Sequence, residues 1–367
     1  MHPTRMSSSG PIRLIEAGAT SALRSQTIYH GLAYARTPRT PDTVVLLTPA
    51  EPYVCIGFHQ DLEREVDTAW CGDRGLPVLR RETGGGAVYL DSDQLFVQWV
   101  MAGESLPARV DRRFELFARP LVATYRDFGV AAEFRPVNDV HVDGRKIVGT
   151  GAAHIGEAEV LVGNLIFDFD TGVMTRVLRT PSEAFREQVR QSLDAYMTSI
   201  RRETGSSPDR GAVAAAYARH CATALGRDLE PGTLTAEEER AIDLVDQRFT
   251  SSEFRTRAGG RPWRGVKIHE DVHVAESVYG HPDGDVRITA RLRRGFIDAV
   301  AFTRNDHGQF DGLQPLIDGL REIPLDHLAV SRVVRARHPA GDALTPGEVD
   351  GWVSAVLDLD PNREATR

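Results

Sequence analysis

Hydrophobic residues change their spacing several times along this chain, and the change restricts it to folds that combine strands with helices. Between Thr43 and Met101, short runs of β-branched, aromatic and aliphatic residues are separated by turn-forming residues, as is typical of strands. Large apolar residues in 110–128 instead recur at helical spacing, and Gly129 ends that pattern. The strands expected in the first region are 43–48, 53–58 and 95–101.

A boundary between two domains is expected at Glu230–Thr233, where proline and glycine interrupt the pattern. Residues Thr235–Glu238 then have the form of a capping box, which predicts a helix to about Phe249. Residues 264–303 alternate apolar and polar side chains, which predicts a small antiparallel sheet. The other expected elements are strands within 140–169 and helices from 182, over 212–225, near 312–321 and near 347–358.

Length and composition fit two globular domains. The chain has 367 residues, more than one typical domain, and its 41% hydrophobic residues suffice for a sizeable core. We therefore predict an α/β fold of mixed (α+β) type. A large domain over 11–232 would have mixed β-sheets and flanking helices, and a small α+β domain would follow over 235–360.

Charge and cysteine content exclude several classes of protein. A formal net charge of −8 argues against general binding of nucleic acid or anionic membranes. The three cysteines form no CxxC pair, so neither a disulfide scaffold nor a cysteine zinc site is expected. No apolar run reaches the ~18–20 residues of a membrane span, and residues 1–10 lack the apolar core of a signal peptide. We expect a monomeric cytoplasmic protein.

The most informative stretch is a run of three glycines at 84–86, between two β-like segments. Glycine has no Cβ, so a ligand can approach the backbone closely and successive N–H groups can turn toward an anion. Arg80 and Arg81 add positive charge suited to a phosphate or a carboxylate. A bulged strand junction with two solvated arginines explains the same residues. The stretch matches neither a Walker loop nor a dinucleotide-binding fingerprint.

A second informative stretch is a predicted hairpin around Asp143–Gly144, a strong two-residue turn signal. The turn predicts two cross-strand pairs, Val142 with Arg145 and His141 with Lys146. One face is expected to carry Asp139, His141, Lys146 and Val148, and the other Val140 and Ile147. Asp139 would lie diagonally across from Lys146, roughly 7–8 Å between backbones. A lysine fixed beside a carboxylate suits phosphate chemistry, although an exposed pair of little energetic value explains the pattern equally well.

Two other catalytic patterns are discounted. Residues His269–His273 match the HExxH pattern of zinc proteases, which requires a helix to bring both histidines to one metal. The surrounding residues predict strands, on which the two histidines would be about 13 Å apart. No Gly-x-Ser-x-Gly elbow is present, and the cysteines have no histidine beside them, so a nucleophilic triad is not expected.

Taken together, the two informative stretches resemble the lipoate–protein ligase family, which belongs to the wider group of biotin and lipoate ligases and acyltransferases. The matching residues are Arg80–Tyr89 with Asp91, then Asn138–Asp139 and Gly144–Gly149. Further similar segments are Ile56–Gln60, Thr198–Arg201 and Phe249–Phe254. The resemblance covers residues 40–330 and favours a phosphate-binding site over the alternatives.

The resemblance implies an ATP-dependent lipoate–protein ligase. Such an enzyme activates lipoate or octanoate as the acyl-adenylate, releases pyrophosphate and transfers the acyl group to a lysine of an acceptor lipoyl domain. The implied acceptors are a 2-oxoacid dehydrogenase subunit or the glycine-cleavage carrier protein, and the implied cofactors are ATP and Mg²⁺.

The positions that match ATP- or adenylate-binding positions of the family are Arg81, Gly84, Gly85, Gly86, Ala87, Val88, Tyr89, Asn138, Asp139 and Lys146. Lys146 matches the catalytic lysine that contacts both the phosphate and the acyl carbonyl, and Asp139 is the expected Mg²⁺ ligand. Fixed positive charge also suits the loose, anionic transition state of adenylation.

Departures from the family pattern leave the acid open. Leu90 and Val162 stand where histidines are common, and Gln94 stands where an asparagine is usual. The alternatives are an ATP-independent octanoyl or lipoyl transferase with a cysteine nucleophile, a ligase for a different carboxylic acid, or a non-catalytic binder. The transferases of this kind place their cysteine after the second stretch, but no cysteine lies between Cys71 and Cys221. The small C-terminal domain also favours the ligase.

Overall fold

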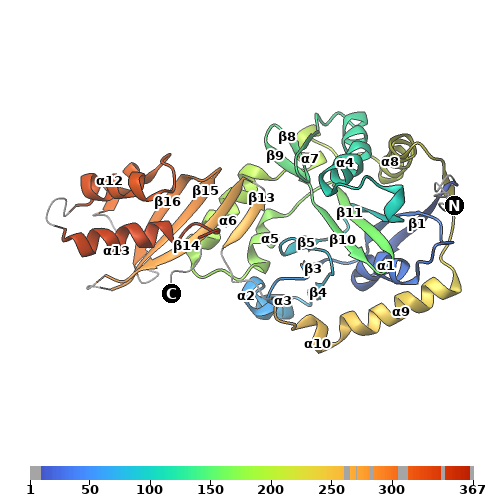
Figure 1. The fold of residues 1–367 in the computed structure, drawn as a ribbon, viewed down its shortest axis with the longest axis horizontal. Helices are drawn as coiled ribbons and strands as arrows, with labels where there is room; N and C mark the ends of the chain where they lie inside the picture. Colours follow the sequence, from blue (N-terminus) through green and yellow to red (C-terminus); the bar gives the residue numbers. More distant parts are fainter. Residues whose placement is uncertain are drawn as a thin grey trace, which may run out of the picture. The chain divides into compact units, whose positions relative to one another are not determined.

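The computed structural model describes residues 10–259, 265–269, 271–281, 284–304, 313–339 and 344–363. Helices and strands alternate through these residues, so the predicted mixed α/β class is confirmed (Figure 1). The chain divides into two compact units. Unit 1 comprises Met1–Val177 and Met197–Arg261, and unit 2 comprises Leu178–Tyr196 and Pro262–Arg367.

Unit 1 is built on a six-stranded sheet with the order β10-β11-β6-β2-β1-β12. Its strands are β1 (Ile12–Thr20), β2 (Thr43–Pro49), β6 (Gln94–Met101), β10 (Thr150–Ile155), β11 (Ala158–Ile166) and β12 (Leu229–Pro231). The β1 strand pairs in parallel with β2 and β12, whereas the remaining neighbours are antiparallel. The predicted strands at 43–48 and 95–101 are therefore confirmed.

The central strands β2 and β6 of this sheet are buried on both faces. Along β6, Val97 and Trp99 pack into one hydrophobic cluster with α4 and α8, while Phe96 and Val100 pack into a second cluster with α1. The helices of unit 1 are α1 (Ala22–Ala35), α2 (Leu62–Glu65), α3 (Thr68–Asp73), α4 (Val110–Asp127), α5 (Thr171–Val177), α7 (Ile200–Thr204), α8 (Arg210–Leu225), α9 (Ala236–Thr250) and α10 (Ser252–Arg255), with a 3-10 turn at Gly103–Ser105. Burial on both faces explains why β6 is apolar almost throughout.

Two small sheets carry the stretches singled out above. The first has the order β4-β3-β5, with β3 (Tyr53–Ile56), β4 (Val78–Arg80) and β5 (Val88–Leu90). The second has the order β7-β8-β9, with β7 (Glu133–Arg135), β8 (Asp139–Val142) and β9 (Arg145–Val148). The triple glycine lies in the connection between β4 and β5.

The α9 helix belongs to unit 1, although the predicted division placed residues 235–261 in the C-terminal domain. The predicted capping box is confirmed, since Thr235 and Glu238 exchange side-chain-to-backbone hydrogen bonds. A Cβ on Gly31 of α1 would lie 2.7 Å from the Cα of Ile242, so the two helices meet at a glycine. At the start of α9, Arg13 of β1 binds both oxygens of Glu238.

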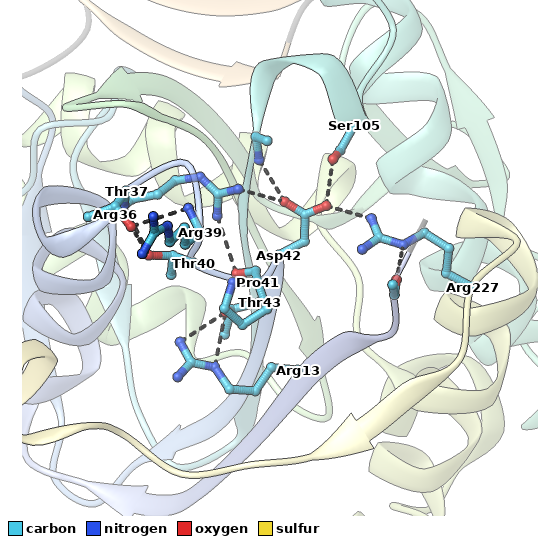
Figure 2. Close-up of polar contacts among 12 residues, drawn as sticks. Arg13, Arg36, Thr37, Arg39, Thr40, Pro41, Asp42, Thr43, Ser105 and Arg227 are labelled. Atoms are coloured by element: carbon cyan, nitrogen blue, oxygen red, sulfur yellow. Dashed lines mark hydrogen bonds and ion pairs between the residues drawn. The ribbon is translucent and has the colours of Figure 1, made fainter. Parts of the chain in front are cut away.

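A buried carboxylate, Asp42, ties together several segments of unit 1 (Figure 2). It is 2% exposed and accepts hydrogen bonds from Arg36 at 3.0 Å, from the Ala102 amide at 2.7 Å and from Ser105 at 2.5 Å. Arg227, which follows α8, forms an ion pair with Oδ2 of Asp42, the oxygen that also accepts from Ser105. Burial raises the pKa of Asp42, but these hydrogen bonds and charges outweigh burial and hold its pKa below the usual value.

Unit 2 has a four-stranded antiparallel sheet with the order β13-β14-β15-β16. Its elements are α6 (Glu183–Tyr196), β13 (Val266–His269), β14 (Val272–Tyr279), β15 (Val286–Arg293), β16 (Phe296–Arg304), α11 (Gln314–Leu320), α12 (His327–Arg337) and α13 (Pro346–Leu357). Trp352 of α13 is 2% exposed and belongs to the hydrophobic core of this unit. The predicted antiparallel sheet is confirmed.

The HExxH segment lies on this sheet, as predicted. His269 ends β13 and His273 lies in β14, so they occupy two strands of a hairpin and not one helix. Glu270 lies outside the described residues. Among the helices that the structure describes, none combines the length and the apolar character needed to cross a bilayer.

Candidate active site

The predicted hairpin is present between β8 and β9. Asp143 and Gly144 form its turn with φ values of 48° and 80°, as a two-residue type I′ turn requires. Both predicted pairs are found, since Val142 pairs with Arg145 and His141 pairs with Lys146. The local turn signal therefore determined the register at the end of the hairpin that carries Lys146.

A bulge changes the register farther from the turn. Val140 pairs with Val148, which leaves Ile147 as an extra residue in β9. Ile147 and Val148 are both 0% exposed and belong to the same hydrophobic core. The prediction that Val148 shares the polar face with Asp139 is therefore wrong, because the bulge turns two successive residues of β9 into the core.

Lys146 and Asp139 form a direct ion pair on the polar face, with Nζ 2.7 Å from Oδ1. The lysine side chain is 18% exposed and the carboxylate 4%, so this is not the exposed pair of the alternative explanation. Burial raises the pKa of Asp139, but the hydrogen bond from His141 and the charge of Lys146 outweigh it and hold that pKa well below the usual range. The Asp139 carboxylate is therefore ionised at neutral pH.

Residues 197–204 form hydrogen bonds and an ion pair with strand β9 of the hairpin. The carbonyl of Lys146 accepts a hydrogen bond from the amide of Thr198 at 2.9 Å. Arg145 donates to both carboxylate oxygens of Glu203, at 2.9 and 3.0 Å. Backbone and side-chain contacts together fix the strand from which Lys146 projects.

Magnesium is difficult to place on Asp139 in this arrangement. A Mg²⁺ ion needs a near-octahedral set of oxygen ligands. The Asp139 carboxylate is buried and its charge is already balanced by Lys146, with His141 Nε2 3.6 Å from Oδ2. The ion would have to displace Lys146 or bind the same carboxylate beside it, so the buried Asp139 carboxylate does not fit a Mg²⁺ ion.

Arg81 shapes the loop that contains the triple glycine. Its guanidinium donates to the carbonyls of Gly84 at 2.9 Å and Gly86 at 2.8 Å, and to that of Cys55 at 3.0 Å. One side chain thereby ties the glycine loop to β3. Its predicted contact with ATP stays a prediction.

Of the three glycines at 84–86, the backbone requires glycine only at 85. Gly85 has φ +97°, a conformation that disfavours any side chain, and its carbonyl lies 2.1 Å from where a Cβ on Gly57 would be. By contrast, a Cβ on Gly84 or Gly86 would meet no atom within 4 Å. The fold itself therefore leaves room beside these two exposed residues, as expected of a loop that a ligand approaches.

Alanine at Gly84 or Gly86 should therefore leave folding intact but impair ligand binding. We expect an unchanged unfolding midpoint and at least about a tenfold loss of activity, because a Cβ would hold the ligand away from the backbone. Gly72→Ala is the matched control, since a Cβ there also meets nothing. Full activity in Gly84→Ala and Gly86→Ala, measured by acyl transfer and thermal unfolding, would contradict a ligand at this loop.

Arg80 does not serve the role expected of both arginines. It is 0% exposed, and its guanidinium donates to five carbonyls. The acceptors are Gly57, Phe58, Gln60, Arg255 and Arg257. The prediction that Arg80 offers charge to a ligand is wrong, because this side chain holds two segments of backbone together inside unit 1.

Glu82, directly before the glycines, is held by residues that the sequence did not single out. Its backbone N–H donates to Nε2 of the buried His30 at 3.2 Å, while Nδ1 of that ring donates to the carbonyl of Gln26 at 2.7 Å. The Glu82 carboxylate accepts from Tyr34 at 2.8 Å and pairs with Arg248 of α9. Two helices thus fix the entry to the loop.

The ring of His30 is neutral in the folded protein. Burial lowers its pKa to about 3, and its Nε2 must stay unprotonated to accept from Glu82. In the unfolded chain the His30 ring takes up a proton near pH 6.5, whereas in the folded protein it does so only near pH 3. The contribution of the neutral ring to the free energy of unfolding is therefore complete above pH 6.5 and is lost as the pH falls toward 3. The loss amounts to about 1.4 kcal/mol per pH unit.

His30→Gln is the variant that tests this pH dependence. The glutamine amide can donate and accept in place of the two ring nitrogens but does not titrate. Between pH 6.5 and 4.5 we expect urea denaturation to show a steeper loss of stability in the wild type than in the variant. Equal slopes would show that His30 is not the titrating group.

A chain of side-chain amides links the hairpin to the triple-glycine loop. The Gly149 amide, which follows β9, donates to Oδ1 of Asn164 at 2.9 Å, and Nδ2 of Asn164 donates to Oε1 of Gln94 at 2.7 Å. Nε2 of Gln94 then donates to the carbonyl of Tyr89 at 3.3 Å. Asn164 was missed from the sequence, where the only signal is an amide inside an apolar strand.

The remaining predicted positions lie on either side of this link. Ala87 and Val88 are partly exposed, whereas Tyr89 is 9% exposed and donates its amide to the sulfur of Met174 at 3.2 Å. Asn138 is partly exposed, and its carbonyl accepts from Thr150 at 2.5 Å. Their roles in binding ATP or an adenylate stay predictions.

Comparison with known proteins identifies relatives of this arrangement. Residues 26–222 match the family model of the lipoyl protein ligase A/B catalytic domain. An octanoyltransferase, LipM, of Kyrpidia tusciae is 28% identical over 271 residues, covering 67% of this chain and 98% of the relative. Subunit 1 of lipoate-protein ligase A from Thermoplasma acidophilum is 25% identical over 240 residues, covering 62% of this chain and 88% of the relative.

The fold also matches a solved structure. The bi-partite lipoate protein ligase of Thermoplasma acidophilum, studied with its E2 lipoyl domain, superposes with a TM-score of 0.61 at 23% identity. The match covers 70% of this chain and 99% of that chain. At this identity the likeness concerns the fold.

Proposed function

Because the chain belongs to the lipoyl protein ligase A/B catalytic domain family, we propose that it attaches a lipoyl or octanoyl group to a lysine of an acceptor lipoyl domain. The observation that carries the proposal is the pairing of Lys146 with buried Asp139 on a braced hairpin, linked to a glycine loop with open space beside Gly84 and Gly86. The acceptor is inferred from the names of the relatives.

Lys146 suits either way of activating the acyl group. When ATP activates a carboxylate, negative charge builds up on the transferring phosphate, and when a thioester or adenylate is attacked, it builds up on the acyl oxygen. A fixed ammonium stabilises both. Asp139 orients the Lys146 side chain through their 2.7 Å contact, so the contribution of the ammonium needs no rearrangement during the reaction.

The relatives and the cysteines support different routes. The name of the Kyrpidia protein, which matches more of its own length than the Thermoplasma subunit does, favours ATP-independent octanoyl transfer. Such a transfer through an enzyme thioester needs a reactive thiolate. The burial of the three cysteines of this chain argues against it.

All three thiols are shielded from solvent. Burial raises the pKa of Cys71 to about 11 and that of Cys221 to about 12, and also raises the pKa of Cys55. None is more than 1% exposed. This supports ATP-dependent activation of lipoate or octanoate as the first route, with ATP-independent octanoyl transfer as the second candidate.

The deciding experiment supplies a lipoyl domain with either of two donors. One arm contains octanoate or lipoate with MgATP, and the other contains octanoyl acyl-carrier protein without ATP. The mass of the lipoyl domain reports transfer, and pyrophosphate reports adenylation. Transfer that requires ATP supports the ligase, whereas transfer in the second arm alone contradicts it and supports the octanoyltransferase.

Cysteine-to-serine variants make the same distinction independently. A ligase should keep its rate when Cys55, Cys71 and Cys221 are replaced one at a time, provided that each variant folds. A variant that folds but loses transfer would identify a nucleophile.

A panel of carboxylic acids tests the identity of the substrate. Adenylation of an acid other than lipoate or octanoate would assign that acid as the substrate. Binding of an acid without any transfer would indicate a binding protein.

A further inference from the structure

The amide chain between the hairpin and the glycine loop has only one possible direction. The Gly149 N–H can only donate, so it fixes the acceptor oxygen of Asn164 and turns Nδ2 toward Gln94. The Tyr89 carbonyl can only accept, so it independently fixes Nε2 of Gln94 on the loop side. Both ends demand the same orientation of both amides, and neither can flip without breaking a bond.

The two amides are also shielded from water. Gln94 is 1% exposed and Asn164 is 9% exposed. They lie where β6 and β11 pair, with Gln94 opposite Ile166 and Phe96 opposite Asn164. Loss of a hydrogen bond by a buried amide costs more free energy than the same loss at the surface, where water replaces the partner. The geometry of these hydrogen bonds is therefore firmly held.

The chain of amide hydrogen bonds ends at the predicted site on both sides. Gly149 follows the strand of Lys146, whereas Tyr89 lies three residues after the last glycine of the loop. Gln94 also hydrogen-bonds to Asp91, whose pKa burial raises. The side chains of Gln94 and Asn164 thereby connect the strand of Lys146 to the glycine loop, and neither side chain needs to touch the substrate.

We propose that Gln94 and Asn164 are positioning residues that set the distance between Lys146 and the triple-glycine loop. The proposal rests on the acyl-transfer function proposed above. Misplacement of a reacting group by about 1 Å can cost 10²-fold in rate. Breaking the amide chain should therefore slow transfer by about 10- to 100-fold while the KM for each substrate changes little.

Isosteric acids break one link at a time. In Asn164→Asp the Gly149 amide keeps its acceptor, but a carboxylate oxygen now faces Oε1 of Gln94. In Gln94→Glu the bond from Asn164 survives, but a carboxylate oxygen faces the Tyr89 carbonyl. Asn164→Ser, uncharged and too short to reach Gln94, is the fallback if an acid prevents folding.

Gln98→Glu is the matched control, because Gln98 lies on the same strand, is 1% exposed and donates instead to the carbonyl of Ser25 at 2.8 Å. It should show a comparable loss of stability without a loss of rate per folded molecule.

The pH dependence of Asn164→Asp gives a second test. Protonation of its carboxyl group restores a donor toward Gln94, so the rate of this variant relative to the wild type should rise as the pH falls.

The test combines transfer kinetics with hydrogen exchange in the protein without substrate. We expect the amides of residues 84–91 to exchange faster in Asn164→Asp and Asn164→Ser but not in Gln98→Glu. Unchanged exchange and a kcat within about twofold of the wild type would overturn the proposal. If the wild type transfers no acyl group, the proposed function fails, and unchanged exchange in this loop would then overturn the positioning role by itself.

Discussion

Replacing Lys146 by alanine is expected to lower the rate of acyl transfer by about 10²–10³-fold, as removal of a single fixed electrostatic donor does in other enzymes. The reason is that the ammonium is held by Asp139 before the reaction and stabilises charge that develops only in the transition state. The effect should appear in kcat, measured with whichever acyl donor the wild type accepts.

Stability must be separated from catalysis in this variant. Alanine leaves the 4% exposed Asp139 carboxylate without its main counter-charge, so folding should also weaken, unlike after loss of an exposed lysine. The double variant Lys146→Ala, Asp139→Asn removes both charges and should recover much of the stability but none of the rate. Recovery of the rate as well would assign the defect to folding.

Lys267, the other lysine of the chain, supplies the control. It lies on β13 of unit 2 with an exposed side chain. Lys267→Ala changes the net charge by the same amount and should leave transfer within about twofold of the wild type, since a surface substitution seldom matters. Lys146→Ala with a rate near that of the wild type would refute the assignment of the site.

Replacing Asp42 by alanine should have the largest effect on stability. It leaves Arg36, whose side chain is 6% exposed, and Arg227 without a carboxylate, and it removes the acceptor of the Ala102 amide. Removing one partner of a buried ion pair costs about 3–5 kcal/mol. Urea denaturation of the full chain should show this loss.

Acidity and an exposed carboxylate provide two checks on Asp42. Because its folded pKa lies below the unfolded value, its stabilisation is complete above about pH 4 and disappears as the pH falls through the folded pKa. The difference in free energy of unfolding between the wild type and Asp42→Ala should therefore shrink in acid.

An exposed carboxylate provides the control. Asp127→Ala, which removes an exposed partner of Arg219 and His220, should cost less than about 1 kcal/mol of stability. Equal losses in both variants would contradict the role of burial.

Local signals in the sequence predicted local structure well. The turn at Asp143–Gly144 and the capping box at Thr235 each act through neighbouring residues, so both were found where the pattern placed them. The bulge at Ile147 has no such signature, because either register of β9 offers apolar residues to the core.

Burial of polar residues explains what the sequence concealed. The α1 helix buries Gln26, Thr27 and His30 as well as its apolar side chains, so no apolar stripe marks it as a helix. The five carbonyl partners of Arg80 come from residues as far away as Arg257, and nothing near Arg80 in the sequence distinguishes it from Arg81. The contacts of Glu82 with Tyr34 and Arg248 likewise join residues that are far apart in the sequence.

The path of the chain through unit 2 limits how such a protein can be divided or recombined. Helix α6 lies between two segments of unit 1 in the sequence, yet it contacts β13, β14 and β15, and Ser182 just before it binds Glu276 at 2.6 Å. A stop codon after residue 261 would leave α6 with Phe185, Val189 and Leu193 deprived of the sheet that covers them. Exchange of the C-terminal part between homologous genes would create a mismatched helix unless residues 178–196 were exchanged with it. The two units are compact in space, but they are not separable modules of the gene.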